Sequence, residues 1–231
     1  MFSFIRSIFI SAFIYTLLPF SVSAEEKSTL LLFGDSIIAG YGLATEESVP
    51  AQLQAILEKE YSVQVINGGV SGDTTSGGRG RLAWTLDKHH PDIVVLALGG
   101  NDVLRGIPPR ITQENIAAML ELLKEREITT VLSAVQAPNN LGEGYLEQFN
   151  AIYTKAADQY DVPVYPFLIH KTFGNKELSL SDGIHPNAKG SKLIAHDLAK
   201  YLKENQELLS KLSRKHMTSI YGRSPSSSVI N

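Results

Sequence analysis

Residues 93–98 read Ile93-Val94-Val95-Leu96-Ala97-Leu98, an apolar stretch without a single charge. A strand whose two faces are both covered by helices has this composition, whereas a strand with one face in water alternates apolar and polar residues. The stretch therefore predicts a central strand of a parallel sheet.

Further strands and helices alternate on either side of this stretch. Short apolar runs occupy residues 29–33, 63–66, 129–135 and 162–167. Apolar residues recur at helical spacing in residues 49–61, 116–123, 145–160 and 193–202, with Thr112 as the expected N-cap of the second helix. This alternation implies right-handed crossovers and helices on both faces of a parallel sheet. We therefore predict a single three-layer α/β domain.

Composition narrows the possible functions. The 231 residues suffice for one sizeable core, and the formal net charge of −3 leaves no basic excess for binding nucleic acid. The chain has no cysteine, which excludes disulfides, thiolate metal sites and a cysteine nucleophile.

The N-terminus has the pattern of a secretion signal. Arg6 precedes an apolar run over residues 8–20, and Val22-Ser23-Ala24 supplies the small residues of a cleavage site. The alternative is an uncleaved membrane anchor, but the run is short against the roughly 20 residues that span a bilayer. We predict a signal peptide over residues 1–24, cleavage after Ala24, and a periplasmic or secreted protein without a stable membrane span.

The C-terminus differs from the domain that we expect over residues 25–204. Residues 205–231 are basic and contain the low-complexity segment Ser224-Pro225-Ser226-Ser227-Ser228. We expect this tail to extend the last helix and then to become partly disordered. Contact with an acidic surface is the alternative.

Polar and glycine-rich segments follow each predicted strand. They lie at residues 34–36, 67–74, 99–102, 137–140 and 181–187. In an open α/β sheet, ligands bind beyond the carboxyl ends of the strands. The sequence therefore predicts an active site at this edge.

Ser36, His185 and Asp182 are the candidate catalytic residues. A serine hydroxyl needs a base to act as a nucleophile, and an imidazole can take and return that proton. Asp182 stands three residues before His185, from where its carboxylate can reach Nδ1 of the ring. The alternatives are an N-cap serine and a helix-capping aspartate beside a surface histidine. A metal site is not expected because no third ligand is evident.

Gly72 and Asn101 are candidate oxyanion-hole residues. The backbone N–H groups of Gly72 and Ser36 and the side-chain amide of Asn101 could converge on a tetrahedral intermediate. Taken singly, Gly72 and Asn101 could be turn residues. The α/β-hydrolase fold itself is disfavoured, because Ile38 replaces the second glycine of the Gly-x-Ser-x-Gly elbow.

These segments resemble the four blocks of the SGNH, or GDSL, hydrolase superfamily. The likeness rests on residues 32–36, 71–74, 98–106 and 182–187, which occur in the right order and together are highly specific. Within the superfamily, the chain is most similar to the bacterial thioesterase I, protease I and lysophospholipase L1 group, which includes arylesterases.

The resemblance implies a flavodoxin-like fold with strand order 2-1-3-4-5 and no cofactor. It implies Ser36 as nucleophile, His185 as general base and acid, Asp182 as its orienting partner, and the oxyanion hole described above. It also implies export to the periplasm and cleavage of acyl-thioesters, aryl esters and lysophospholipids. A mobile loop beside the acyl pocket would correspond to residues 138–145, so we expect Pro138, Asn139 and Leu141 to contact substrate.

Two other functions are open. A carbohydrate O-acetyl esterase is the first, although Trp84 is the sole tryptophan and the aliphatic Leu141 suits an acyl chain better than a sugar. A periplasmic binding protein without catalysis is the second. We expect a monomer or weak dimer that acts on a small-molecule ester or thioester.

Overall fold

The structure, a computed structural model, describes residues 27–212. The predicted signal peptide over residues 1–24 and the last part of the expected tail, residues 213–231, lie outside the described residues.

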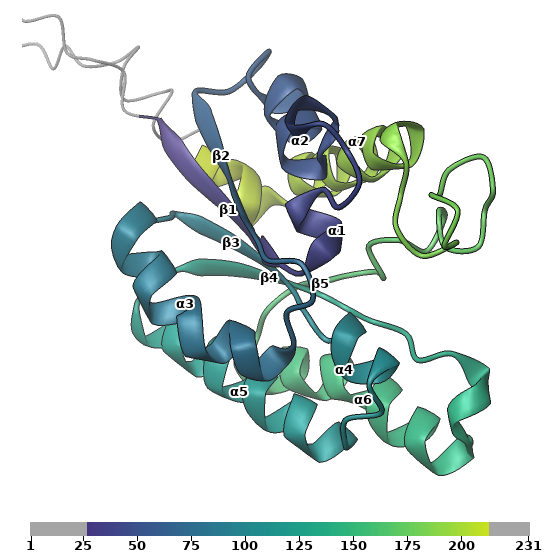
Figure 1. Ribbon diagram of the computed structural model, residues 1–231. Coiled ribbons are helices and arrows are strands. Elements are labelled where there is room, and N and C mark those ends of the chain that lie inside the picture. The colour runs from purple at the N-terminus through teal and green to yellow at the C-terminus, as the bar shows by residue number, and fades with distance from the viewer. Residues whose placement is uncertain (1–26, 213–231) are drawn as a thin grey trace, which may run out of the picture.

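A five-stranded parallel sheet with the order β2-β1-β3-β4-β5 forms the centre of the molecule (Figure 1). This confirms the expected strand order. The strands are β1 (Ser28–Gly34), β2 (Val63–Gly69), β3 (Ile93–Ala97), β4 (Thr129–Ser133) and β5 (Val164–Tyr165).

The last strand is shorter than the predicted run over residues 162–167. Pro163 and Pro166 flank β5, and neither has an N–H group that could extend the ladder. Pro163 still contributes its carbonyl, which accepts the Leu132 N–H at 3.0 Å. The proline pair therefore limits β5 to two residues.

Helices cover both faces of the sheet, so the domain has the expected three layers (Figure 1). Helices α3, α5 and α6 lie together on one face, while α2 and α7 pack against each other on the opposite face. The short helix α1 packs against β1 and β2. The α-helices are α1 (Ser36–Ala39), α2 (Val49–Leu57), α3 (Thr75–His89), α4 (Gly100–Leu104), α5 (Pro109–Glu125), α6 (Glu143–Tyr160) and α7 (Ala188–Glu204), and the 3₁₀ helices are η1 (Thr45–Glu47) and η2 (Asn139–Leu141).

Side chains of β1 alternate between two cores because successive residues of a strand point to opposite faces. Leu30 and Leu32 pack with α2 and α7 in one core. Leu31 and Phe33 pack with α3, α5 and α6 in the other. All four side chains are fully buried, which holds the strand that leads into Ser36 from both sides.

Thr112 is not the N-cap that the sequence predicted. Helix α5 begins at Pro109, where a proline is favoured because its missing N–H would have no intrahelical partner. Thr112 is therefore one turn inside α5, fully buried, and its hydroxyl donates to Asp102 Oδ1 at 3.0 Å.

Helix α3 is absent from the predicted elements. Gly77, Gly78 and Gly80 weaken its helical pattern, since glycine is a poor helix former. Thr74 caps it by accepting the Gly77 N–H.

The packed domain extends beyond the predicted boundary at residue 204. Residues 206–212 form a further helical segment whose first N–H groups are capped by the Asn205 side chain. Leu208 and Leu212 are fully buried in the core beneath α2 and α7. The tail was expected to extend the last helix; in the structure Asn205, with an extended ψ of 112°, ends α7, and the residues after it form a separate helical segment.

The chain between residues 27 and 212 contains no helix that is both long and apolar enough to cross a membrane.

Candidate active site

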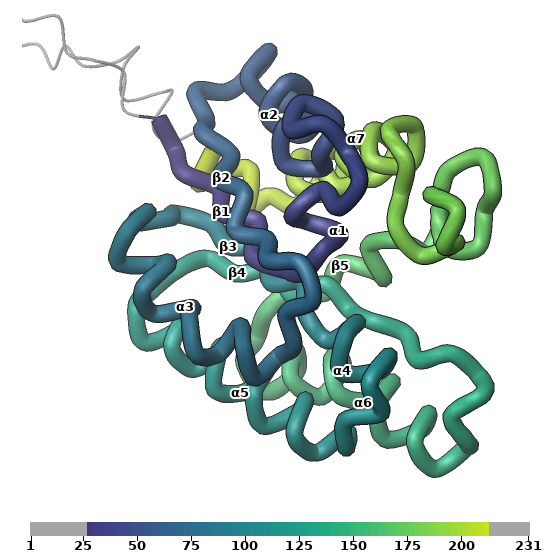
Figure 2. The backbone as a smooth tube through the Cα atoms, viewed as in Figure 1, coloured from purple at the N-terminus to yellow at the C-terminus, as the bar shows by residue number. Residues whose placement is uncertain are grey.

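The expected site residues lie at the carboxyl edge of the sheet. Figure 2 shows the connections that follow β1, β3 and β4 emerging there, and the long connection from β5 to α7 folding back beside α7.

Ser36 is the first residue of α1, immediately after β1. The N-cap role that could have explained a serine here belongs to Asp35, whose Oδ1 accepts the Ile37 N–H at 3.1 Å. The Ser36 hydroxyl is therefore not needed to cap the helix.

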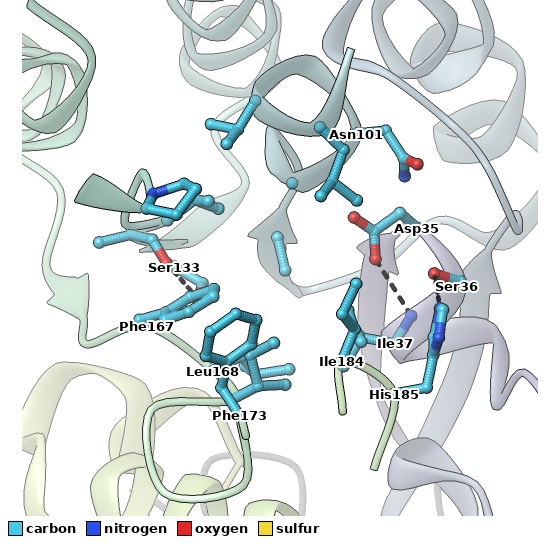
Figure 3. Close-up of a pocket in the computed structure, with 18 residues that line it drawn as sticks. Asp35, Ser36, Ile37, Asn101, Ser133, Phe167, Leu168, Phe173, Ile184 and His185 are labelled. Atoms are coloured by element: carbon cyan, nitrogen blue, oxygen red, sulfur yellow. Dashed lines mark hydrogen bonds between the residues drawn. The ribbon is translucent and has the colours of Figure 1, made fainter. Parts of the chain in front are cut away.

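His185 comes from the connection between β5 and α7 and faces Ser36 (Figure 3). Its Nε2 lies 2.8 Å from Ser36 Oγ, although the two residues are 149 positions apart. Asn187 caps α7 by accepting the N–H groups of Lys189 and Gly190, so neither His185 nor Asp182 serves as that cap.

Asp182 holds the opposite side of the imidazole. Its Oδ2 lies 2.7 Å from His185 Nδ1, and its Oδ1 accepts the N–H groups of Ile184 and His185. Partial burial works against ionisation, but the hydrogen bonds from the His185 ring and from these two N–H groups outweigh it and lower the pKa of Asp182. Asp182 is therefore a carboxylate, which fixes a proton on Nδ1 and leaves Nε2 free to accept one from Ser36.

Asn101 lies in α4 with its amide directed to the segment after β2. Its Nδ2 donates to the Asp73 carbonyl at 2.9 Å. A side-chain amide has two N–H donors, so a second donor remains after this bond, and Asn101 and Ser36 both line the same cavity. The Ser36 N–H belongs to the first turn of α1, where backbone donors have no intrahelical acceptor.

Gly72 adjoins Asp73 and has a φ of +80°, a conformation that favours glycine. Its carbonyl accepts a hydrogen bond from the Arg105 guanidinium at 2.8 Å. Gly72 does not line the cavity itself. Gly72 belongs to the loop that Asn101 anchors, because the Asn101 amide donates to the carbonyl of Asp73, the residue after Gly72.

Gly99 makes the turn from β3 into α4 possible. Its φ is +123°, and a β-carbon there would lie 2.0 Å from the Tyr153 hydroxyl, which donates to the Leu98 carbonyl. Only glycine satisfies both constraints, and this turn brings Asn101 to the site.

A cavity of about 130 Å³ opens beside Ser36 and His185. Figure 3 shows Phe167, Leu168 and Phe173 across the cavity from Ser36, with Ser133 on that far side. The lining is mostly apolar and includes Val103, Leu104, Val135, Phe167, Leu168, Ile169, Phe173 and Ile184.

The predicted substrate-contact residues divide into two sets. Pro138 lines the cavity. Asn139 is exposed in η2 and Leu141 packs against the core that contains Phe149, so neither lines the cavity. In the structure, residues 167–173 replace them as a cavity wall.

Asp35 also lines the cavity and is only 7% exposed. Burial raises the pKa of its carboxyl to about 6, although the Ile37 N–H and the nearby His185 favour the charged form. Asp35 lies in the segment 34–36 that follows the first predicted strand, but its residue type alone indicated no role.

Tyr41 was missed altogether. Its ring lies against the His185 ring, with centroids 4.5 Å apart. Gly40 and Gly42, both with positive φ, flank it and are the sequence signal for the tight turn that places it there.

No group of three or more His, Asp or Glu side chains within residues 27–212 is arranged to hold a metal ion.

Known proteins are similar to this chain in sequence and in fold. Residues 32–193 match the GDSL-like Lipase/Acylhydrolase family. The chain is 37% identical over 187 residues to an arylesterase from Vibrio mimicus, which covers 79% of this chain and 94% of that protein. It is 38% identical over 186 residues to thioesterase 1/protease 1/lysophospholipase L1 from Escherichia coli strain K12, with 80% and 88% covered.

A solved structure shows the same architecture. The psychrotrophic esterase EstA from Pseudoalteromonas sp. is similar with a TM-score of 0.74 and 30% identity, and the match covers 77% of this chain and 98% of EstA.

Proposed function

This chain belongs to the GDSL-like lipase/acylhydrolase family and is a carboxylic-ester hydrolase, and we propose that it hydrolyses acyl esters and acyl-thioesters through an acyl-Ser36 intermediate. One observation carries the proposal: Ser36 Oγ, His185 and Asp182 form an unbroken hydrogen-bonded series with distances of 2.8 and 2.7 Å.

In the acylation step, Ser36 Oγ attacks the carbonyl carbon of the substrate while His185 Nε2 takes the hydroxyl proton. The imidazolium that forms is stabilised by the Asp182 carboxylate. The N–H groups of Ser36 and Gly72 and the Asn101 amide donate to the oxyanion. Collapse of the tetrahedral intermediate releases the alcohol or thiol, which takes its proton from His185 Nε2.

Deacylation repeats these events with water. His185 removes a proton from the water as it attacks the acyl carbon, and returns it to Ser36 Oγ as the carboxylic acid leaves. The enzyme regains its starting state, and all protons are accounted for by one imidazole.

The cavity supports hydrocarbon acyl groups as substrates. Its apolar lining would bury methylene groups, each worth about 0.8 kcal/mol. Aryl esters, lysophospholipids and acyl-thioesters are the substrate classes that we propose, because the arylesterase and thioesterase 1/protease 1/lysophospholipase L1 relatives bear those names. A carbohydrate O-acetyl esterase is less well supported, because Trp84 is 64% exposed on α3 and does not line the cavity.

The nucleophile is tested with Ser36→Ala and with Ser210→Ala, an exposed serine outside the site, as its matched control. Ser36→Ala should abolish hydrolysis of p-nitrophenyl esters and covalent labelling by a fluorophosphonate, while Ser210→Ala retains both. Labelling of Ser36→Ala at the wild-type rate would refute the nucleophile assignment. Absence of labelling in the wild-type protein would instead favour the binding-protein alternative.

The acyl class is tested by chain length. With one leaving group, kcat/KM should rise by about fourfold per added methylene until the cavity is filled. Equal rates for all chain lengths, together with release of acetate from an acetylated glycan, would favour the carbohydrate esterase.

We also propose that the protein is exported, on the pattern of residues 1–24. Expression in a Gram-negative host should yield a periplasmic or secreted protein that begins at Glu25, and N-terminal sequencing of that fraction would detect any other start. We propose that it acts as a monomer or weak dimer, which sedimentation would test.

A further inference from the structure

Arg81 is a largely buried cation that the proposed mechanism does not use. It lies in α3, and its side chain is 22% exposed. Its Nε donates to Asp73 Oδ2 at 2.7 Å and its Nη2 donates to the Gly34 carbonyl at 2.9 Å. The guanidinium also lies over the Phe33 ring, 3.9 Å from the ring centroid.

These contacts join two parts of the active site. Gly34 ends β1, two residues before Ser36, so one contact holds the strand that delivers the nucleophile. Asp73 follows Gly72, and its carbonyl accepts the Asn101 amide. Its carboxylate is 9% exposed and therefore has little access to water as a substitute partner.

The loop is shaped to accept this contact. A β-carbon at Gly77 would lie 1.9 Å from Asp73 Oδ1, so the glycine leaves the room that the carboxylate occupies. Arg81 is thus the shared partner of the nucleophile strand and of the loop on which the Asn101 amide is anchored.

We propose that Arg81 is a positioning residue that sets the oxyanion hole at its working distance from Ser36. The inference rests on the proposed function, since it assigns Arg81 to the reaction through Asp73, Gly72 and Asn101. Arg81 does not line the cavity and makes no contact with the acyl group in this scheme. It acts by fixing the donors, which stabilise the transition state only when they are already in place.

The chemistry of the side chain explains why arginine stands here. A guanidinium offers donors in different directions from one rigid plane and can stack on an aromatic ring at the same time. A lysine ammonium is a single point charge on a flexible stem, so it cannot hold Asp73 and Gly34 while covering Phe33.

The first test is Arg81→Lys, which keeps the positive charge but removes the planar guanidinium and its N–H donors. We expect kcat to fall about 10- to 100-fold, since removing an oxyanion donor entirely costs about 10²–10³. KM for a medium-chain p-nitrophenyl ester should change by less than about threefold, because the cavity wall is untouched. Arg126→Lys is the matched control. Arg126 pairs with Asp87 near the C-terminal ends of α5 and α3, and the kcat of this variant should equal that of the wild type.

A second readout separates positioning from a merely structural role. Affinity for a boronic acid, which forms a tetrahedral adduct with the serine, should fall in parallel with kcat/KM in Arg81→Lys. Affinity for the product fatty acid should stay within about threefold of wild type. Equal loss of both affinities, or loss of kcat only in proportion to the folded fraction, would overturn the proposal.

Asp73→Ala provides an independent route if Arg81→Lys does not fold. It removes the same ion pair from the other side, and it should lower kcat and boronate affinity in the same way. The kcat of the double variant should be little lower than that of the worse single variant, because both substitutions remove the same Arg81–Asp73 ion pair. Full kcat in Asp73→Ala would overturn the inference. The proposed function fails separately, through Ser36→Ala, so the two outcomes cannot be confused.

Discussion

Asp35 combines two roles that oppose each other. Its carboxylate caps α1 and thereby leaves the adjacent serine hydroxyl free for the imidazole. The same carboxyl is buried beside an apolar cavity, and burial raises its pKa from 3.8 to about 6. At neutral pH the site therefore contains a charge that the folded protein holds at a cost in stability.

Asp35→Asn should raise the stability of the protein above pH 6. The folded pKa lies above the unfolded value, so the folded state binds the proton more tightly, and stability falls as pH rises from about 4 to 6. The penalty levels off once the pH has risen through the folded pKa, about one pH unit above it, and is then on the order of 3 kcal/mol. An asparagine keeps an oxygen for the Ile37 N–H and removes the charge, so thermal unfolding should shift upward at pH 8 and little at pH 4.

The exposed Asp161 supplies the control. It ends α6 with a φ of 53°, which asparagine also tolerates, so Asp161→Asn should show no such pH-dependent gain. A gain for Asp35→Asn that is equal at both pH values would show that ionisation is not its cause.

For single residues, the sequence identifies functional side chains whose partners lie nearby in the sequence. Asp182 and His185 are three residues apart, and local geometry brings them together. It does not locate Arg81, because the arginine of a helix can face any of several neighbours and only tertiary packing directs it to Asp73 and Gly34. Sequence also could not show that Pro138 lines the cavity while Asn139 and Leu141 do not, because cavity walls depend on packing that no linear pattern reports.

Helices α3, α4 and α5 meet at Asp102, which is fully buried. Its carboxylate accepts the N–H and the hydroxyl of Thr75, at the start of α3, and the hydroxyl of Thr112 in α5. Asn115 donates in turn to Thr75 Oγ1 at 3.2 Å. A single carboxylate thus joins three helices directly behind Asn101.

Thr112→Val should destabilise the protein. Valine has the same shape but removes one donor to a buried carboxylate, which costs about 1–3 kcal/mol. Urea unfolding followed by circular dichroism would measure the loss. Ser191→Ala in α7 is the opposite case, since its buried hydroxyl has no partner among the described residues, and we expect no loss or a gain of about 1 kcal/mol. Equal losses in both variants would show that the Asp102 contacts contribute nothing specific.

The sequence predicted the boundaries of some strands and helices well and missed others, depending on whether local composition or tertiary packing sets them. The apolar runs predicted four strands well. In β1, β3 and β4 most residues are buried, which leaves a direct compositional trace, whereas the edge strand β2 is mostly half-buried or exposed. Helix α3 and the start of α5 could not be placed in this way. The glycines of α3 hide its pattern, and Pro109 rather than Thr112 sets the first turn of α5.

For the whole molecule, the segment after Asn205 completes one of the two cores. Leu208 and Leu212, one helical turn apart, pack beneath α2 and α7, and the Lys211 carbonyl accepts the Ser28 hydroxyl at the start of β1. The basic composition of the tail concealed these two leucines from sequence reasoning. Their spacing of four residues was the available signal.

Leu212→Ala should therefore destabilise the domain by about 2–5 kcal/mol, as large-to-small changes in a core do. Glu207→Ala, on the exposed side of the same segment, should change stability by less than about 0.5 kcal/mol. Chemical denaturation of both variants tests this. If Leu212→Ala matched Glu207→Ala, the segment would not be part of the cooperative fold.

The separation of Ser36 and His185 by 149 residues has a consequence for how the protein is made. During synthesis, the serine emerges long before the imidazole that activates it, so an incomplete chain has no esterase activity. Contacts between distant residues form late in folding because a long loop must close first. Hydrolysis is therefore switched on by the final assembly of the fold, and recovery of activity after refolding should lag behind recovery of helix.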